Sequence, residues 1–444
     1  MHFFNVNQMN QKKIILWSIT AALAGFLFGF DTVVISGADK DLQLLWGSSD
    51  FFHGTVVMGS ALWGTLFGAL IGGYPTNVYG RKKTLIIIGV LYTVSAIGSG
   101  LAINPISFSG FRFLGGIGVG VSTIAAPAYI AEIAPSAHRG KLVSMYQFNI
   151  VLGILMAYLS NFLFSSIEHE SWRWMIGVEA FPAFIYTILA FLIPKSPRWL
   201  ISKNRIIEAT EILKTIDSDH NAEEIVENVK NSSSNSKATI WDKKYRKPVI
   251  WTILIAMFNQ LSGINAFLYY APRIFQEAGL GEQTALLSSI GIGVVNLAFT
   301  LLGVLLIDRS GRKTLIFYGS IGYIVSLSLV SISFLFNWNM QLVPVFFFLF
   351  IAAHAIGQGA VIWVFISEIF PIKVRSYGQT LGSSTHWILA AIIPSLIPFL
   401  FSFVGPAMVF IFFTVMMVLQ LFFVKFSMPE TKGVALEKMQ DIIK

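Results

Sequence analysis

Three charged side chains lie deep inside long apolar segments of the sequence: Asp31, Arg112 and Glu179. Asp31 is the one charged residue of FLFGFDTVVISG, residues 26–37. A charge at the centre of a membrane helix costs about 2.5–3.5 kcal/mol on insertion scales, and such residues commonly mark proton or ion pathways. Asp31 and Arg112 have opposite charges and could pair. An arginine favours the charged form of a carboxyl group and burial disfavours it, so in such a pair Asp31 would be suited to taking up and releasing a proton. The alternative is a static ion pair that joins two helices.

A second group of side chains consists of neutral amides in apolar segments. Amides both donate and accept hydrogen bonds, so buried amides could bind a neutral ligand that carries hydroxyl groups, whereas carboxylates that bind hydroxyls are more costly to bury. The amides are Gln147, Asn259, Gln260, Asn265 and Asn296. The alternative role for each of them is a hydrogen bond that holds two helices together.

Two of these amides need a break in their helix to reach the same point. Gln260 and Asn265 are five residues apart, about 140° around a straight helix. Gly263 lies between them and permits a discontinuous helix of the kind that transporters use at their binding sites. Aromatic rings suit the apolar C–H faces of such a ligand. Trp363 is the main candidate for such stacking, and further candidates are Phe28, Tyr269 and Trp387.

These residues must be positioned by membrane helices, as the composition indicates. The chain has 444 residues, of which 55% are hydrophobic and 12% charged, and its mean hydropathy is +0.69. This is too little charge to cover a soluble protein, and segments of about 20 apolar residues match a bilayer core of roughly 30 Å. There is no cysteine, which excludes disulfides, thiolate catalysis and Cys-ligated metals. We expect an all-α fold of twelve spans near residues 14–37, 52–73, 84–103, 108–130, 142–164, 174–194, 248–271, 284–307, 314–336, 342–366, 377–402 and 404–426.

The distribution of positive charge predicts the orientation of these spans. If the N-terminus is cytoplasmic, all but four of the 31 Lys and Arg residues fall on the cytoplasmic side; the exceptions are Lys40, Arg173 and Arg273 outside and Arg112 within a span. Positive residues favour that side, so we expect both termini in the cytoplasm. The net charge of +8 therefore reflects topology and not nucleic-acid binding.

One long polar segment, residues 195–247, separates the sixth and seventh spans. Apolar residues recur at helical spacing over 204–216 and more weakly over 220–230, which predicts two short amphipathic helices. Residues 231–237, NSSSNSK, are typical of a flexible linker. A plain solvated connector between two halves would account for much of the same pattern.

Motifs of the first half return in the second. NVYGRKKTL (77–85) follows the second span and DRSGRKTL (308–315) the eighth, while AEIAPSAHRG (131–140) and SEIFPIKVRS (367–376) follow spans four and ten. Two parallel repeats of six spans would place a substrate site at their interface near the membrane midplane, with access alternating by rocking. Arginine and glutamate residues in these loops could lock the cytoplasmic side shut, although they could also only set the topology. The candidate gating residues are Asn77, Gly80, Arg81, Glu132, Arg139, Asp308, Gly311, Arg312, Glu368 and Arg375.

These motifs make the sequence resemble a sugar porter of the major facilitator superfamily over essentially its whole length. The resemblance rests on the two GRK loops, RFLGGIGVG from Arg112, PKSPRWL (194–200), NQLSGINAFLYYAP (259–272) and PETKG (429–433). It implies that Arg198 joins the gating network. It also implies that Asp31 couples sugar transport to protons, with Arg112 as its partner and Glu179 as an auxiliary group, since family members that only facilitate diffusion tend to carry a neutral residue at this position.

The sequence departs from the family pattern at four positions. Asn77 replaces the superfamily's common Asp, as in many sugar porters, and Lys195 replaces the Glu of PESPRWL. Asn259 replaces the first Gln of QQLSGIN, and His386 precedes Trp387 where relatives usually carry an amide. The last two changes fall in the expected sugar site, so His386 is also a candidate contact and the sugar itself is left open. His354 is expected to be a packed or hydrogen-bonded residue.

We therefore expect a monomeric proton-coupled symporter for a pentose or hexose in a cell membrane, the inner membrane if the source is bacterial. Its expected parts are a six-helix bundle (1–194), a cytoplasmic linker (195–247), a second bundle (248–428) and a cytoplasmic tail (429–444). The alternatives are an uncoupled facilitator and a transporter-like sugar sensor. No nucleotide, metal or cofactor motif is present that would favour an enzyme.

Overall fold

The structure is a computed structural model that describes residues 2–135, 138–167, 169–216, 240–371 and 374–433, with side chains from residue 12 on. All regular secondary structure within these ranges is helical. Eleven helices there are long and apolar enough to cross a membrane. The segments 50–58 and 60–71, which meet at an angle of 42°, make a twelfth span if counted as one. Every expected span falls on one of these helices, so the expectation of twelve is confirmed.

The first six spans come from residues before the linker. Four of them are single helices: α1 (His2–Val34), α6 (Arg81–Gly100), α7 (Pro105–Ile133) and α8 (Arg139–Phe164). The second span is bent and consists of α3 (Asp50–Phe52), a π-helical turn (His53–Met58) and α4 (Ser60–Ile71). The sixth span consists of α9 (Ser171–Gly177) and α10 (Ala180–Leu192). A short 3-10 turn (Ile35–Gly37) and α2 (Asp39–Trp46) follow α1, and α5 (Gly73–Val78) follows α4. We call this set the N-half.

The second six spans follow the linker and form the C-half. They are α14 (Arg246–Leu261) with α15 (Ile264–Glu277), α16 (Glu282–Ser310), α17 (Arg312–Phe336), α18 (Val343–His354) with a π-helical turn (Ala355–Gly359) and α19 (Ala360–Ile369), α20 (Arg375–Val404), and α21 (Pro406–Phe426). Two of these spans are interrupted within the membrane, between α14 and α15 and between α18 and α19.

Helices of the N-half pack closely because small residues face one another. An added Cβ on Gly116 of α7 would lie 2.0 Å from the carbonyl oxygen of Ala61 in α4, and one on Gly64 of α4 would lie 2.2 Å from the carbonyl oxygen of Phe113. The backbones of α4 and α7 therefore meet directly, as small residues allow in membrane proteins. This packing fixes α7, the helix that carries Arg112.

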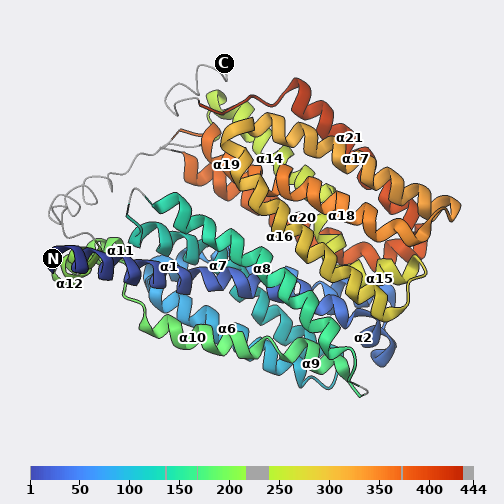
Figure 1. Ribbon diagram of the computed structural model, residues 1–444, viewed down its shortest axis with the longest axis horizontal. Coiled ribbons are helices and arrows are strands. Elements are labelled where there is room, and N and C mark those ends of the chain that lie inside the picture. The colour runs from blue at the N-terminus through green and yellow to red at the C-terminus, as the bar shows by residue number, and fades with distance from the viewer. Residues whose placement is uncertain (1, 136–137, 168, 217–239, 372–373, 434–444) are drawn as a thin grey trace.

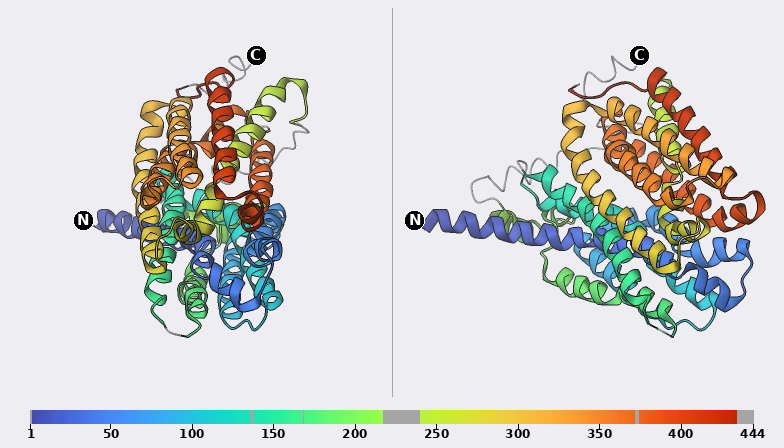
Figure 2. Two further views of the ribbon diagram at one scale, coloured as in Figure 1. Left: turned by 90° about the vertical axis from the view of Figure 1, so that its right-hand side faces the viewer. Right: turned by 45° about the vertical axis from the view of Figure 1, so that its right-hand side comes forward.

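The two halves lie side by side and meet most closely at one end (Figures 1 and 2). In Figure 1 the N-half is coloured blue to green and the C-half yellow-green to red, and α8 of the first packs against α16 of the second. The halves approach one another at the end that holds α2 and α15, which we call the α2 end. Toward the opposite end, where α11, α12 and α19 lie, their helices diverge. We call this the linker end.

The linker contains two short helices, α11 (Pro197–Ser202) and α12 (Ile206–Ile216). They bury Leu200, Ile201, Ala209 and Leu213 against each other, which confirms the amphipathic helix expected over 204–216. The second expected helix, over 220–230, and the linker 231–237 lie outside the described residues.

Candidate functional site

The three charged residues of the apolar segments meet inside the N-half. The Nη1 group of Arg112 on α7 donates to a carboxylate oxygen of Asp31 on α1, and its Nη2 donates to the Asp31 carbonyl oxygen at 2.8 Å. Glu179, between α9 and α10, lies close enough for its charge to act on both residues. All three are 1% exposed. Two carboxyl groups thus lie near one guanidinium, and all three groups are shielded from water.

This charged cluster is not saturated with hydrogen bonds. Arg112 Nε and Glu179 Oε1 are buried without a hydrogen-bond partner among the described residues, and so are the hydroxyls of Tyr92 and Ser95 on the neighbouring α6. Buried polar groups without partners are rare in folded proteins. Among these atoms the carboxyl oxygen Oε1 of Glu179 is an unpaired acceptor, so the cluster has a place for an additional proton.

The amides of the seventh span meet across the break in their helix. Gly263 has a φ of +87°, the left-handed region that favours glycine, and separates α14 from α15. Across this break Asn265 Nδ2 donates to Gln260 Oε1 at 2.9 Å, and Gln260 Nε2 donates to Asn259 Oδ1 at 3.0 Å. The expected break at Gly263 is therefore confirmed, and it aims Gln260 and Asn265 at one point.

Aromatic rings from other spans adjoin these amides. Gln260 Nε2 lies 3.2 Å from His386 Nδ1 on α20, and the His386 ring lies 5.2 Å from that of Trp363 on α19 and 5.0 Å from that of Trp387. Phe28 of the N-half reaches the group through Trp387, at a ring distance of 5.8 Å. We call Phe28, Asn259, Gln260, Asn265, Trp363, His386 and Trp387 the amide cluster.

Three expected sugar contacts have no described contact with the amide cluster. Asn296 on α16 is buried and accepts a hydrogen bond from Thr300 at 3.4 Å, and Gln147 on α8 is half-buried without a described hydrogen bond. Tyr269 on α15 is buried near Arg112 and Asp31, on the side of the charged cluster. His354, expected to be packed or hydrogen-bonded, has its Nδ1 2.6 Å from the Tyr323 hydroxyl.

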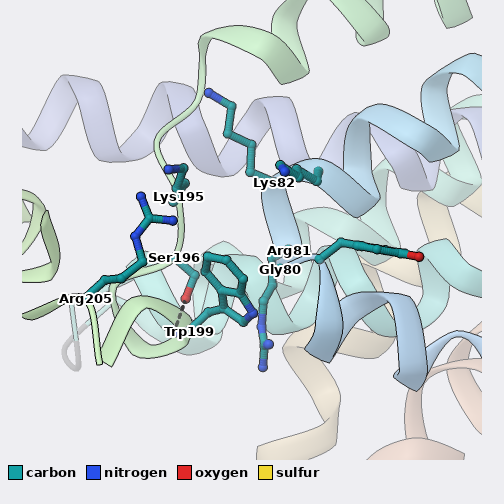
Figure 3. Close-up of a pocket in the computed structure, with 9 residues that line it drawn as sticks. Gly80, Arg81, Lys82, Lys195, Ser196, Trp199 and Arg205 are labelled. Carbon is teal, nitrogen blue, oxygen red and sulfur yellow. Dashed lines mark hydrogen bonds between the residues drawn. The ribbon is translucent and has the colours of Figure 1, made fainter. Parts of the chain in front are cut away.

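At the linker end, the repeated gating residues of the N-half pair with one another. Arg81 on α6 donates through Nε to Glu132 at 3.1 Å, with its Nη2 at 2.9 Å, and Asn77 accepts from Arg81 at 3.3 Å. Gly80, with a φ of +85°, makes the turn before α6 and lies against the Trp199 ring (Figure 3). Ser196 completes the group by donating to Glu132.

The C-half repeats this arrangement. Arg312 donates to Glu368 through Nε at 3.1 Å and through Nη2 at 2.8 Å, a bidentate pair, and contacts Asp308 at 3.2 Å. Gly311 has a φ of +91°. Thr431 takes the place of Ser196 and donates to Glu368 at 2.6 Å, while Glu430 accepts from the backbone N–H of Arg312 at 2.9 Å. The PETKG motif therefore caps α17, a role that the sequence did not reveal.

These pairs lie within each half, whereas the sequence had suggested a lock between the halves. Arg139 and Arg375 keep buried N–H groups without partners, and neither pairs with a described carboxylate. Arg198 is exposed and forms no ion pair with a described residue. The arrangement seen here thus holds the linker end of each half in shape and leaves these three arginines available.

Lys195, which replaces the Glu of the family's PESPRWL motif, pairs with a carboxylate of the linker. Its Nζ lies 3.3 Å from Glu208 on α12, which also accepts from Arg205. The hydrogen bonds from Arg205 and then Lys195 hold the pKa of Glu208 below its ordinary value. A cavity of about 70 Å³ adjoins these residues (Figure 3). It is lined by Tyr79, Gly80, Arg81, Lys82, Lys83, Lys195, Ser196, Trp199 and Arg205.

The α2 end holds a polar group that the sequence did not single out. Arg273 on α15 of the C-half contacts Asp39 on α2 of the N-half, with Nη1 3.4 Å from Oδ2, and donates to Gln43 at 2.9 Å. The one available signal was that Arg273 is among the few cations on the outer side. The sequence could not indicate its partner, because the two residues are 234 positions apart.

Comparisons with known proteins agree with this description. The sequence model of the family described as "Sugar (and other) transporter" matches residues 17–443. The arabinose-proton symporter of Bacillus subtilis is 34% identical over 440 residues, covering 97% of this chain and 95% of the relative. The D-xylose-proton symporter of Escherichia coli is 32% identical over 473 residues, covering 98% and 96%.

Solved structures add information on conformation. The inward open conformation of the xylose transporter XylE from E. coli matches with a TM-score of 0.85 at 30% identity, covering 97% of this chain and 99% of that chain. The proton:xylose symporter XylE bound to 6-bromo-6-deoxy-D-glucose matches with a TM-score of 0.79 at 31% identity, covering 98% and 100%. The TM-score is thus higher with the inward open structure than with the one bound to 6-bromo-6-deoxy-D-glucose.

Proposed function

The chain belongs to the family of sugar and other transporters, and from this premise we propose that it carries a monosaccharide and a proton together across a membrane. The family and its structural relatives are transporters of the major facilitator superfamily and not enzymes. We propose a pentose or hexose as substrate and alternating access as the mechanism. Two relatives are named as an arabinose-proton and a D-xylose-proton symporter, which supports this assignment.

The observation that carries the proposal is the buried cluster of Asp31, Arg112 and Glu179. One guanidinium balances one carboxylate, so a second ionised carboxylate would leave an uncompensated buried charge, which is strongly unfavourable. The cluster is therefore neutral when one proton is held between Asp31 and Glu179. Any movement that admits water or changes the distance to Arg112 alters how firmly that proton is held. This is the property that a coupling site requires.

We propose that the amide cluster binds the sugar. Its amides now satisfy one another, and sugar hydroxyls would take over these hydrogen bonds at little net cost, since hydroxyls also donate and accept. Trp363, which is 39% exposed, would stack on an apolar face of the ring. Gln147, Tyr269 and Asn296 would reach the sugar only when the halves close around it. Tyr269, beside Arg112, would relay that closure to the charged cluster.

We further propose that the linker end is cytoplasmic and the α2 end faces outward, in the bacterial inner membrane if the source is bacterial. The Lys and Arg asymmetry supports this orientation. In the outward-facing arrangement Arg139, Arg198 and Arg375 would join the loop glutamates to lock the cytoplasmic side. The boundaries 1–194, 195–247, 248–428 and 429–444 and function as a monomer belong to the same proposal.

Reconstitution into proteoliposomes tests the function. With an acidic exterior, the wild-type protein should accumulate a labelled pentose or hexose above its external concentration. Asp31→Asn should only equilibrate the sugar, while Asp242→Asn, which alters an exposed loop carboxylate, should accumulate it like the wild type. Equilibration by wild type and Asp31→Asn alike would establish an uncoupled facilitator. Sugar binding without any flux would point to a sensor.

A further inference from the structure

The carboxylate of Asp39 joins the two halves at the α2 end. Its Oδ1 lies 2.7 Å from Nε2 of His53, in the π-helical turn of the same half. Its two oxygens lie 3.5 and 3.4 Å from Nη1 of Arg273, which belongs to the opposite half. The side chains are 2%, 0% and 12% exposed, so this contact is largely shielded from water.

Arg273 has further partners in the N-half. Its Nη1 donates to Gln43 Oε1 at 2.9 Å, and its Nη2 lies 3.9 Å from Asp50 Oδ1. Gln43 in turn donates through Nε2 to Asp50 at 2.7 Å, so these acceptors are held in one network. Every described polar partner of the Arg273 side chain comes from the other half of the molecule. This differs from the linker end, where arginines pair within their own half.

The surrounding space shows that the contact lies in the seam between the halves. A cavity of about 180 Å³ beside it is lined by residues of both, including Ser36, Asp39, Pro272, Arg273, Gln276 and Leu286. Ser36 is 3% exposed and its hydroxyl has no hydrogen-bond partner among the described residues. Deeper in the same seam, Tyr158 of the N-half donates to the Leu268 carbonyl oxygen of the C-half at 2.9 Å.

We propose that Asp39, Gln43, Asp50, His53 and Arg273 form an outer latch that keeps the outer side shut in the inward-facing arrangement. The latch rests on the proposed alternating-access function, because it must open once in each transport cycle. When the halves separate, Arg273 enters water, whereas Asp39 keeps His53, which lies in its own half. Breaking a buried ion pair is strongly unfavourable when it leaves a charge buried without a partner. Here neither charge is left in that situation. The latch is therefore reversible, and His53 positions the Asp39 carboxylate for reclosing.

The chain contains no cysteine, so a single introduced cysteine reports on access without background labelling. Ser36→Cys is nearly isosteric and faces the cavity beside the latch. We would measure its reaction with a membrane-impermeant maleimide added outside intact cells, in the absence of sugar. Adding Asp39→Asn or Arg273→Gln should raise the labelling rate about tenfold, because removing one partner shifts the population toward the outward-open state.

The matched control is Lys40→Gln, which breaks the neighbouring cross-half pair with Glu277. That pair spans 3.9 Å and both side chains are more than a third exposed, so the change should alter labelling less than twofold. If both single latch variants fail to reach the membrane, the labelling rate is measured in the double variant Asp39→Asn/Arg273→Gln. This variant leaves neither charge without a partner.

A rise of fivefold or more over the control supports the latch, and a smaller rise, no change or a decrease overturns it. Because the readout needs no sugar and no proton gradient, the latch can fail while proton-coupled transport stands. Conversely, if the latch is confirmed but sugar uptake does not respond to the pH gradient, the latch proposal stands and the proposed proton coupling is wrong.

Discussion

The N-half and the C-half share a fold plan but differ in the chemistry of their interiors. The N-half buries a charged cluster of Asp31, Arg112 and Glu179, each 1% exposed. The C-half contributes neutral amides and aromatic rings, centred on Gln260 and Trp363. On this difference rests our proposal that one half handles the proton and the other half supplies most of the sugar contacts. Tyr269 of the C-half lies near the charged cluster, and Phe28 of the N-half contacts Trp387 of the amide cluster.

The largest effect is expected where a charge is left alone in the N-half. Arg112→Met leaves Asp31 and Glu179 without a cation, and breaking a buried pair in this way costs about 3–5 kcal/mol. The thermal unfolding midpoint of the purified protein should fall sharply. The double variant Asp31→Asn/Arg112→Met should recover much of the loss. Equal midpoints for wild type and Arg112→Met would show that the charged cluster contributes nothing to the stability of this half.

A smaller effect is expected in the C-half, and it should appear in sugar binding. Gln260→Ala removes hydrogen bonds to a hydroxyl, and Trp363→Ala removes a stacking surface. Each should weaken affinity by about 1–3 kcal/mol, or roughly 5- to 150-fold. Binding titrations at two pH values would sharpen the comparison, because the loss should be the same at both if the proton is handled elsewhere. Unchanged affinity in both variants would mean that the sugar does not bind at the amide cluster.

The smallest effect is expected at the helix break that positions these amides. Gly263→Ala must keep a positive φ, at a cost of about 1–2 kcal/mol, and its Cβ would lie 2.8 Å from the Phe413 ring. Relaxation toward a continuous helix would separate Gln260 from Asn265 and weaken sugar binding modestly. Gly279→Ala is the control, since Gly279 also has a positive φ but an open surrounding. Equal sugar affinities in the two variants would argue against a role for the break.

Much of this organisation could be predicted from the sequence because it depends on local patterns of residues. Apolar length predicts the spans, and the repeated GRK loops predict two related halves. The glycine between Gln260 and Asn265 predicts the broken helix. The pairing of Asp39 with Arg273 could not be predicted, because residues 234 positions apart meet only through the packing of α2 against α15. The loop arginines were also expected to bridge the halves, whereas Arg81 and Arg312 each pair within one half.

The central claim is that Asp31 moves a proton together with the sugar. The most direct test is to add sugar to proteoliposomes without an imposed pH gradient and to record the internal pH. The wild-type protein should show acidification of the lumen that begins with sugar entry, and Asp31→Asn should admit sugar with no pH change. Sugar entry without acidification in the wild type, or the same acidification in Asp31→Asn, would contradict the account.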